Sequence, residues 1–118
     1  MSKFAALIAD LAAPPTVTPR ERAHAAAAAV QTSLFGRLRK ARGSAVAGRL
    51  AWMLVRLGQS DHVDCRAAHE AIQSVPLPDV KLFLLAARAT RDTAKREGAA
   101  EVAGGVVAAL ESEVERRG

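Results

Sequence analysis

The sequence predicts an all-α protein, a single domain over residues 1–118 in which about six short helices form a compact bundle. Three observations favour this fold. Alanine, the residue with the highest helix propensity, supplies much of the apolar content. The other apolar residues recur mostly at helical spacing, and strand-like alternation is hard to find. Proline and glycine divide the chain at short intervals, which predicts short connections and mostly antiparallel neighbours.

Residues 2–13 are expected to form the first helix. Its apolar residues recur at spacings of three and four, so they share one face and make the segment amphipathic. Pro14 and Pro15 end it, because neither can continue a helix. The apolar face consists of Phe4, Leu7, Ile8 and Leu11.

The second helix, residues 19–42, has the clearest start signal in the chain. Thr18 is expected to cap it, Pro19 to occupy its first position, and Glu21 to complete a capping box. Gly43 is expected to end it. Its predicted buried edge is Val30, Leu34, Leu38 and Ala41.

Two helices are predicted in the middle of the chain. Ser44 is expected to cap the first, over residues 45–57, and Gly58 to end it. The second, over residues 62–74, is short and ends before Pro76. The predicted buried stripe of the first consists of Val46, Leu50, Met53, Leu54 and Leu57.

The last two helices complete the predicted bundle. One begins at about Pro78 and contains "VKLFLLAA", which is apolar almost all round and therefore predicts the central helix. Its polar continuation, "RATRDTAKREG", is expected to project into solvent. The other covers residues 99–116, where Gly104 and Gly105 should allow another backbone to approach closely.

Charge is distributed unevenly along the chain. The net charge is +5 and the isoelectric point is about 10.3, which favours an anionic partner. Between Arg20 and Arg56 there are eight Lys and Arg against Glu21 alone. From Glu97 onward the balance reverses, with five Glu against two Arg, so the basic residues are concentrated in the middle segments.

Three short cationic rows are the candidate nucleic-acid-binding residues. The first lies in "LFGRLRKARG", at the end of the second helix. The other two share the spacing i, i+3, i+7, and one of them brackets a tryptophan, as in proteins that stack a base between phosphate contacts. The rows are Arg37, Arg39, Lys40 and Arg42; Arg49, Trp52 and Arg56; and Arg88, Arg91 and Lys95.

The same residues have a purely structural interpretation. Cations in the last turns of a helix stabilise it by complementing its dipole. Trp52 could pack at a core boundary under the stems of its neighbouring arginines. Arg88 and Arg96 each lie four residues from Asp92 and could pair with it.

Sequence-independent contact with the backbone of RNA or single-stranded DNA fits the cationic rows better than reading of bases. There is no convincing helix-turn-helix turn, no zinc-finger spacing, and few Asn or Gln that could read base edges. Two alternatives remain open. One is a helical protein–protein interaction module, such as an adaptor, a regulator or a phage assembly factor, and the other is a dimeric DNA-binding regulator.

Metal binding and catalysis are not expected. His62, Cys65 and His69 have helical spacing, but three ligands from one short helix cannot surround a zinc ion alone. A Cys65–His69 nucleophile and base would lack a third orienting group. The sequence contains no glycine-rich phosphate loop and no serine-elbow motif. We therefore expect a non-enzymatic protein without a cofactor or a small-molecule substrate.

The single cysteine and the lack of an 18-residue apolar run predict a cytoplasmic protein that does not contact membranes. With its short length, helical content, cationic faces and missing active-site motif, the chain resembles the small subunits of class 1 CRISPR effector complexes. The resemblance is one of overall profile and carries over no individual residue. It implies a ribonucleoprotein subunit in antiviral defence, present in several copies, that lines a nucleic-acid path. Glu111, Glu113 and Glu115 could then oppose the basic side of the next copy head-to-tail.

Overall fold

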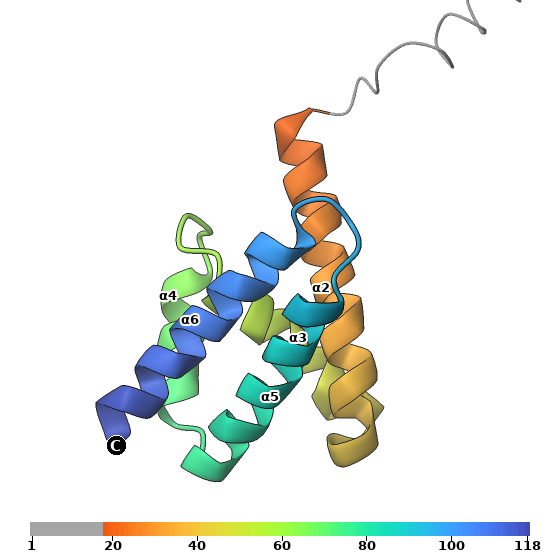
Figure 1. The fold of residues 1–118 in the computed structure, drawn as a ribbon. Coiled ribbons are helices and arrows are strands. Elements are labelled where there is room, and N and C mark those ends of the chain that lie inside the picture. Colours follow the sequence, from red (N-terminus) through yellow and green to blue (C-terminus); the bar gives the residue numbers. More distant parts are fainter. Residues whose placement is uncertain (1–17) are drawn as a thin grey trace, which may run out of the picture.

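The computed structural model describes residues 18–118, which form five helices and no strand (Figure 1). The all-α prediction is confirmed for this part of the chain. The predicted count of about six helices is slightly too high for it, and the helix expected at residues 2–13 lies outside the described residues. The helices are α2 (Pro19–Arg42), α3 (Ser44–Leu57), α4 (Cys65–Gln73), α5 (Leu77–Thr93) and α6 (Ala99–Arg117).

Two antiparallel helix pairs make up the described fold. α2 turns back into α3, α5 turns back into α6, and the short α4 lies in the connection between the pairs (Figure 1). α2 packs on both α5 and α6, and α6 also packs on α3, so the core lies where the two pairs meet. All four long helices contribute large, fully buried side chains to it: Leu34, Leu38, Leu54, Phe83 and Leu110.

The ends of α2 follow the predicted signals. The backbone N–H of Glu21 donates to Oγ1 of Thr18 at 3.1 Å, and Pro19 lies in the first turn. At the other end, Gly43 has a φ of 80°, a left-handed value that favours glycine. Because this turn is so tight, Ser44 is already the first residue of α3. Its side chain makes no capping hydrogen bond, so its predicted capping role is wrong.

α4 and α5 are both shorter than predicted. Nδ1 of His62 accepts a hydrogen bond from the backbone N–H of Asp64 at 3.0 Å, which holds this stretch in a turn, and α4 begins only at Cys65. α5 ends at Thr93, because Ala94 has an extended backbone. The polar stretch after α5 is therefore a connection to α6 and not the projecting helix end that the sequence suggested.

Some predicted core residues are exposed. In α5, Val80 and Phe83 are buried, but Leu85 is 62% exposed, so this helix is not enclosed on all sides as predicted. Val46 and Ala41 are exposed because they lie next to the α2–α3 turn, at the end of that pair. The other residues predicted on the apolar edges of α2 and α3 are buried or partly buried.

The backbones of α3 and α6 come very close where Gly58, at the end of α3, meets Gly105. A Cβ atom added to Gly105 would lie 2.6 Å from the carbonyl oxygen of Gly58, and one added to Gly58 would lie 2.5 Å from the nitrogen of Val106. A Cβ atom on Gly104 would meet nothing within 4 Å. The predicted close approach is therefore confirmed for Gly105 and not for Gly104.

A buried carboxylate ties the end of α6 to the end of α4. Glu113 is 7% exposed, and its carboxylate accepts hydrogen bonds from Arg116 (2.6 and 3.0 Å) and from Arg117 (2.8 Å). Arg117 also donates to the backbone carbonyls of Ile72 and Val75. The hydrogen bonds and positive charges of Arg116, and to a smaller extent of Arg117, together lower the pKa of Glu113 from 4.5 to about 2, against a desolvation effect that raises it.

Candidate nucleic-acid interface

An open groove runs between α2 and α3 on their solvent side. Its floor is made of small side chains, with one aromatic ring from α2: Ala28, Gln31, Thr32, Phe35, Gly48 and Ala51. Trp52 lies one turn beyond Gly48 on α3, because residues four apart share a helix face. Phe35, Arg39, Gly48, Arg49, Trp52 and Arg56 together are called the α2–α3 surface below.

Trp52 offers the α2–α3 surface an accessible aromatic ring. Its side chain is 41% exposed, and the guanidinium of Arg56 lies 5.2 Å from the centre of the ring. Nη1 of Arg56 donates to Oε1 of Gln59 at 2.6 Å, and Nε of Arg56 is buried without a hydrogen-bond partner among residues 18–118. Arg56 is thus held against the protein, where it orients the indole rather than reaching outward.

Arg39 and Arg49 are the outward cations of the α2–α3 surface. The guanidinium of Arg39 lies 6.0 Å from the centre of the Phe35 ring, and both arginines are exposed. Neither makes a hydrogen bond or an ion pair within the described part of the chain. There is no acidic residue between Glu21 and Asp61, so no carboxylate of α3 itself opposes these charges. This surface can attract an anion and present a ring beside it.

Arg37 and Lys40 belong to a different groove, on the α5 side of α2. Nη2 of Arg37 donates to Oγ1 of Thr93 at 2.9 Å and to the carbonyl oxygen of Ala89 at 3.5 Å. Lys40 has no such partner among the described residues. This α2–α5 groove is lined by Gly36, Arg37, Leu38, Lys40, Leu82, Leu85, Ala86 and Ala89. The first predicted row is therefore divided between two sides of α2.

Three further predicted cations are engaged in ion pairs. Arg42 pairs with Asp79 at the start of α5. Nη2 of Arg88 lies 3.1 Å from Oε2 of Glu111 on α6, and Nε of Arg91 lies 3.1 Å from Oδ1 of Asp92. Neither of the suggested pairs with Asp92, from Arg88 or from Arg96, is found among the described residues: Arg88 reaches Glu111, and Asp92 pairs with Arg91. The structural interpretation therefore fits Arg42, Arg88 and Arg91 best, since a phosphate would have to displace the carboxylate that each of them already pairs with.

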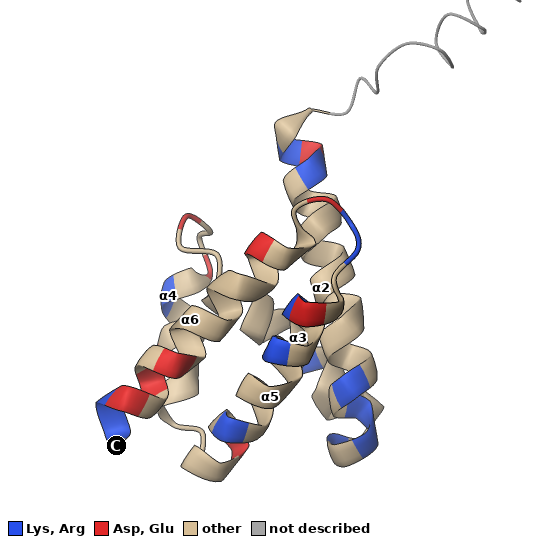
Figure 2. Cartoon of the chain, viewed as in Figure 1, with Lys and Arg blue, Asp and Glu red and all other residues tan. Residues whose placement is uncertain are grey.

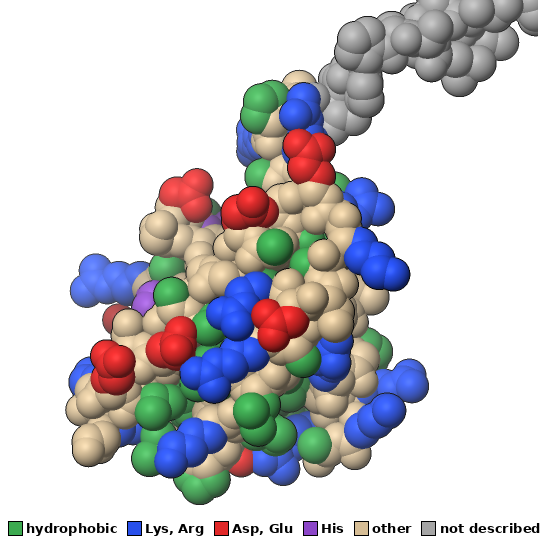
Figure 3. All heavy atoms as spheres, in the orientation of Figure 1, with side chains coloured by type: hydrophobic (Ala, Val, Ile, Leu, Met, Phe, Trp, Pro, Cys, Tyr) green, Lys and Arg blue, Asp and Glu red, His purple; other side chains and the backbone are tan. Residues whose placement is uncertain are grey.

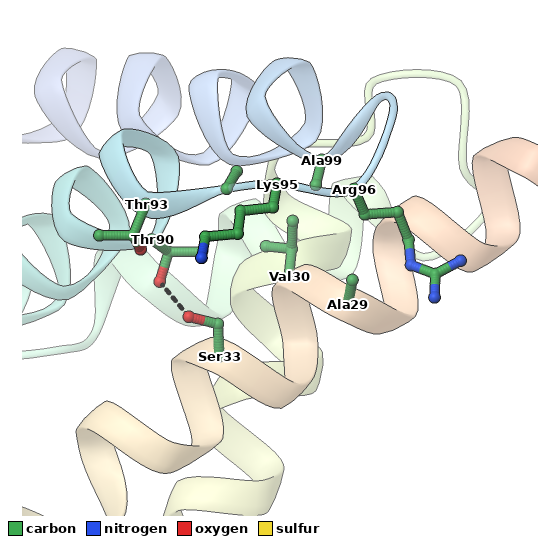
Figure 4. A pocket seen from close by; sticks show the side chains of 9 residues that line it. Ala29, Val30, Ser33, Thr90, Thr93, Lys95, Arg96 and Ala99 are labelled. Atoms are coloured by element: carbon green, nitrogen blue, oxygen red, sulfur yellow. Dashed lines mark hydrogen bonds between the residues drawn. The ribbon is translucent and has the colours of Figure 1, made fainter.

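Lys95 lines a small cavity where the α5–α6 connection passes over α2 (Figure 4). Its side chain lies across the cavity towards Thr90, whereas Arg96 points away (Figure 4). Oγ of Ser33 and Oγ1 of Thr90 form a hydrogen bond of 3.1 Å in the wall. The volume is about 150 Å³. This is below the range of about 300–1,000 Å³ typical of small-molecule sites. None of the residues of the α2–α3 surface lines this cavity.

The cationic surface is broad but interrupted. Lys and Arg lie over the last turns of α2 and in the α5–α6 connection, and acidic residues lie along α6, which ends in Arg116 and Arg117 (Figures 2 and 3). The three predicted rows therefore do not form one continuous site. Phe35 and Gly48 are not among the residues predicted from the sequence, although the four-residue spacing of Phe35 and Arg39 places them on one face of α2.

His62, Cys65 and His69 do not share one helix face. His62 precedes α4 and accepts the hydrogen bond from Asp64, and Cys65 is buried, with its thiol donating to the carbonyl oxygen of Leu57 at 3.7 Å. His69 is exposed. Residues 18–118 contain no group of three His, Cys, Asp or Glu side chains placed to hold a metal ion.

None of the helices from α2 to α6 is both long and apolar enough to cross a membrane. Comparison with known proteins gave no match to a family model, a curated protein or a solved structure. The resemblance to the small CRISPR subunits therefore rests on overall profile alone.

Proposed function

We propose that the protein is a non-catalytic subunit that binds single-stranded nucleic acid, RNA or DNA, on the α2–α3 surface without reading its sequence. The observation that carries the proposal is the exposed ring of Trp52, oriented by Arg56 and lying three residues from Arg49, which has no hydrogen-bond or ion-pair partner among residues 18–118. A base can stack on such a ring while arginines neutralise the flanking phosphates. Arg39 extends the cationic edge across the groove.

A role within a larger ribonucleoprotein agrees with this surface, and it is the role that the resemblance to class 1 CRISPR small subunits implies. The proposed binding site contains fewer residues than the ten that the sequence suggested. Arg42, Arg88 and Arg91 are left out because their charges are already neutralised by carboxylates. Duplex DNA is expected to bind less tightly, because its bases are not free to stack on Trp52.

Fluorescence anisotropy with labelled single-stranded RNA, single-stranded DNA and duplex DNA, between about 50 and 200 mM salt, tests the proposal. Single strands should bind with an affinity that falls as salt rises. Trp52→Ala should weaken binding about tenfold at each salt concentration, because one stacked base contributes about 1–3 kcal/mol. Arg49→Glu should weaken binding and also reduce the slope of log affinity against log salt by about one or more.

Arg66→Glu is the matched control for Arg49→Glu. It makes the same change in net charge, but on α4, where Arg66 is highly exposed and pairs only loosely with Glu70 at 3.6 Å. Its effect on affinity should be much smaller than that of Arg49→Glu. Equal effects of the two substitutions, or unchanged binding by Trp52→Ala, would mean that the α2–α3 surface is not the binding site.

A helical protein-interaction module is the second candidate function. It is favoured by the exposed Leu85, which lies in the α2–α5 groove and has no role in binding nucleic acid on the α2–α3 surface. Absence of binding to all three nucleic acids at about 50 mM salt would favour this second function.

A further inference from the structure

The small cavity beneath the α5–α6 connection is lined by hydrogen-bond donors and by apolar side chains. Two hydroxyls, from Ser33 on α2 and Thr90 on α5, form part of its wall, and Lys95 lies across it (Figure 4). No Asp or Glu of residues 18–118 lines the cavity. The apolar part of the lining consists of Ala29, Val30, Ala94 and Ala99.

Ser33 and Thr90 together have one more hydroxyl hydrogen than they use. Thr90 is 2% exposed, and its Oγ1 lies 3.1 Å from Oγ of Ser33. One of these hydroxyls donates to the other, so the second hydrogen has no acceptor within the described chain. Thr93, in contrast, is already satisfied, because it donates to the carbonyl oxygen of Ala89 at 2.7 Å and accepts from Arg37. The Ser33–Thr90 pair therefore offers a donor to whatever fills the cavity.

Three cations of the described chain lie at this cavity. Lys95 is folded back across it towards Thr90, and Arg96 borders it but points away (Figure 4). Neither makes a hydrogen bond or an ion pair with another residue of the described chain. Nη2 of Arg37 donates to Oγ1 of Thr93 in the wall, at 2.9 Å. The cavity is therefore positively charged.

Neighbouring acids and helix ends do not cancel this charge. The nearest acids in sequence are Asp92, which lies 3.1 Å from Arg91, and Glu97, which lies 3.9 Å from Arg22. Both carboxylates are largely exposed, so water screens them. α5 ends and α6 begins at the cavity, so the negative and positive ends of the two helix dipoles offset one another.

We propose that this cavity binds a small oxyanion of the phosphate class. The oxygens of the anion would accept hydrogen bonds from Lys95 and from the spare hydroxyl hydrogen of the Ser33–Thr90 pair. Water can satisfy the hydroxyl, but it cannot neutralise the cations. The volume of about 150 Å³ has room for a phosphate group, and it is too small for a whole nucleotide or another ligand of ordinary size.

The phosphate has two sources, the free ion or the backbone of a strand bound on the α2–α3 surface. A shallow depression on the alanine side of α2 connects the two sites. Ala28 and Thr32 line both this depression and the α2–α3 groove, and Ala29 and Arg96 line both the depression and the cavity. The second source rests on the proposed function, whereas the first does not.

An NMR titration of the full chain with inorganic phosphate, at constant ionic strength, tests the site. Backbone amide signals of Ser33, Thr90 and Lys95 should shift and saturate, with a dissociation constant of about 1 mM. Acetate should bind more weakly, because it carries less charge and fewer oxygens. Lys95→Gln should raise the dissociation constant for phosphate about tenfold, because it removes a charge-assisted hydrogen bond.

Lys81→Gln is the matched control for Lys95→Gln. It removes the same charge from an exposed lysine at the other end of α5, away from the cavity, and should leave phosphate binding nearly unchanged. The double variant S33A/T90V should raise the dissociation constant about fivefold, because it removes the hydroxyl donor. Since both members of the hydrogen bond are removed together, no polar atom is left unsatisfied and the fold should be retained.

Binding of labelled single strands to Lys95→Gln distinguishes the two sources. If the phosphate belongs to a strand, Lys95→Gln should weaken strand binding, and inorganic phosphate should compete with the strand more strongly than acetate does at equal ionic strength. If the ligand is the free ion, Lys95→Gln should lose phosphate binding and keep strand binding. A chain that binds no strand would refute the proposed function and would leave the phosphate titration as a test of the cavity.

Three results would overturn the proposal. The first is the absence of saturable shifts at the cavity amides up to about 20 mM phosphate. The second is an equal effect of Lys95→Gln and Lys81→Gln, which would mean that phosphate is attracted only by the net charge. The third is unchanged phosphate binding by S33A/T90V and Lys95→Gln, which would place the anion elsewhere on the surface.

Discussion

Gly105→Ala is expected to lower the free energy of unfolding by at least about 2 kcal/mol, although alanine is the better helix former. The added Cβ atom would lie 2.6 Å from the carbonyl oxygen of Gly58. That oxygen belongs to the backbone at the end of α3, so it cannot rotate away as a flexible side chain could. The α3–α6 contact would have to open, and the buried Val106 beside it would lose packing.

Gly104→Ala is the matched control, one residue away on the same helix. Its Cβ atom would meet nothing within 4 Å, so only the gain in helix propensity remains. We expect an increase in the free energy of unfolding of about 0.5–1 kcal/mol. Urea unfolding of the two variants and the wild type measures both effects. Equal stability of the two variants would contradict the close packing of Gly58 on Gly105.

Glu113→Gln is expected to lower the free energy of unfolding by about 2–3 kcal/mol at neutral pH. The amide keeps the shape of the side chain but removes the charge that accepts hydrogen bonds from Arg116 and Arg117. Arg117 would then be less well held against the carbonyls of Ile72 and Val75. The link between α6 and α4 should weaken as a result.

The effect of Glu113→Gln should depend on pH. The pKa of Glu113 is lowered from 4.5 to about 2 in the folded protein, so the unfolded chain binds its proton more readily. The carboxylate therefore stabilises the fold fully above about pH 4.5, and this contribution is lost as pH falls towards about 2. The difference in free energy of unfolding between wild type and Glu113→Gln should shrink over that range.

Glu70→Gln provides the control for Glu113→Gln. Arg66 and Glu70 are also a Glu–Arg pair four residues apart, but both side chains are largely exposed. Such a pair contributes about 0–1 kcal/mol, so its loss should change stability little at any pH. Urea unfolding at about pH 7, 4, 3 and 2 distinguishes the cases. A constant difference between wild type and Glu113→Gln across this series would show that the carboxylate is not stabilised in the fold.

Local signals predicted the fold well where a single residue decides the backbone. Thr18 and Pro19 begin α2, and Gly43 ends it with a left-handed turn that other residues rarely adopt. Boundaries were less accurate where the signal was weaker. α4 starts at Cys65 because His62 bonds to the backbone of its own turn, a contact that side-chain periodicity does not encode.

The candidate site was predicted less completely than the fold. The spacing of Arg49, Trp52 and Arg56 correctly implied that Arg49 and Trp52 are exposed, because that depends only on helix geometry, but Arg56 is partly buried against the protein. Which cations are neutralised depends on contacts between helices. Arg88 reaches Glu111 on α6 and Arg42 reaches Asp79 on α5, so pairing could not be inferred from spacing within one helix.

The crossing of Gly58 and Gly105 also has a kinetic consequence. Each antiparallel pair, α2 with α3 and α5 with α6, joins neighbours in sequence and can form with a small loss of chain entropy. The crossing joins the two pairs and closes a long loop, so it should form late. Gly105→Ala should then accelerate unfolding in stopped-flow experiments and leave the folding rate nearly unchanged. A slower folding rate would instead place this contact in the folding nucleus.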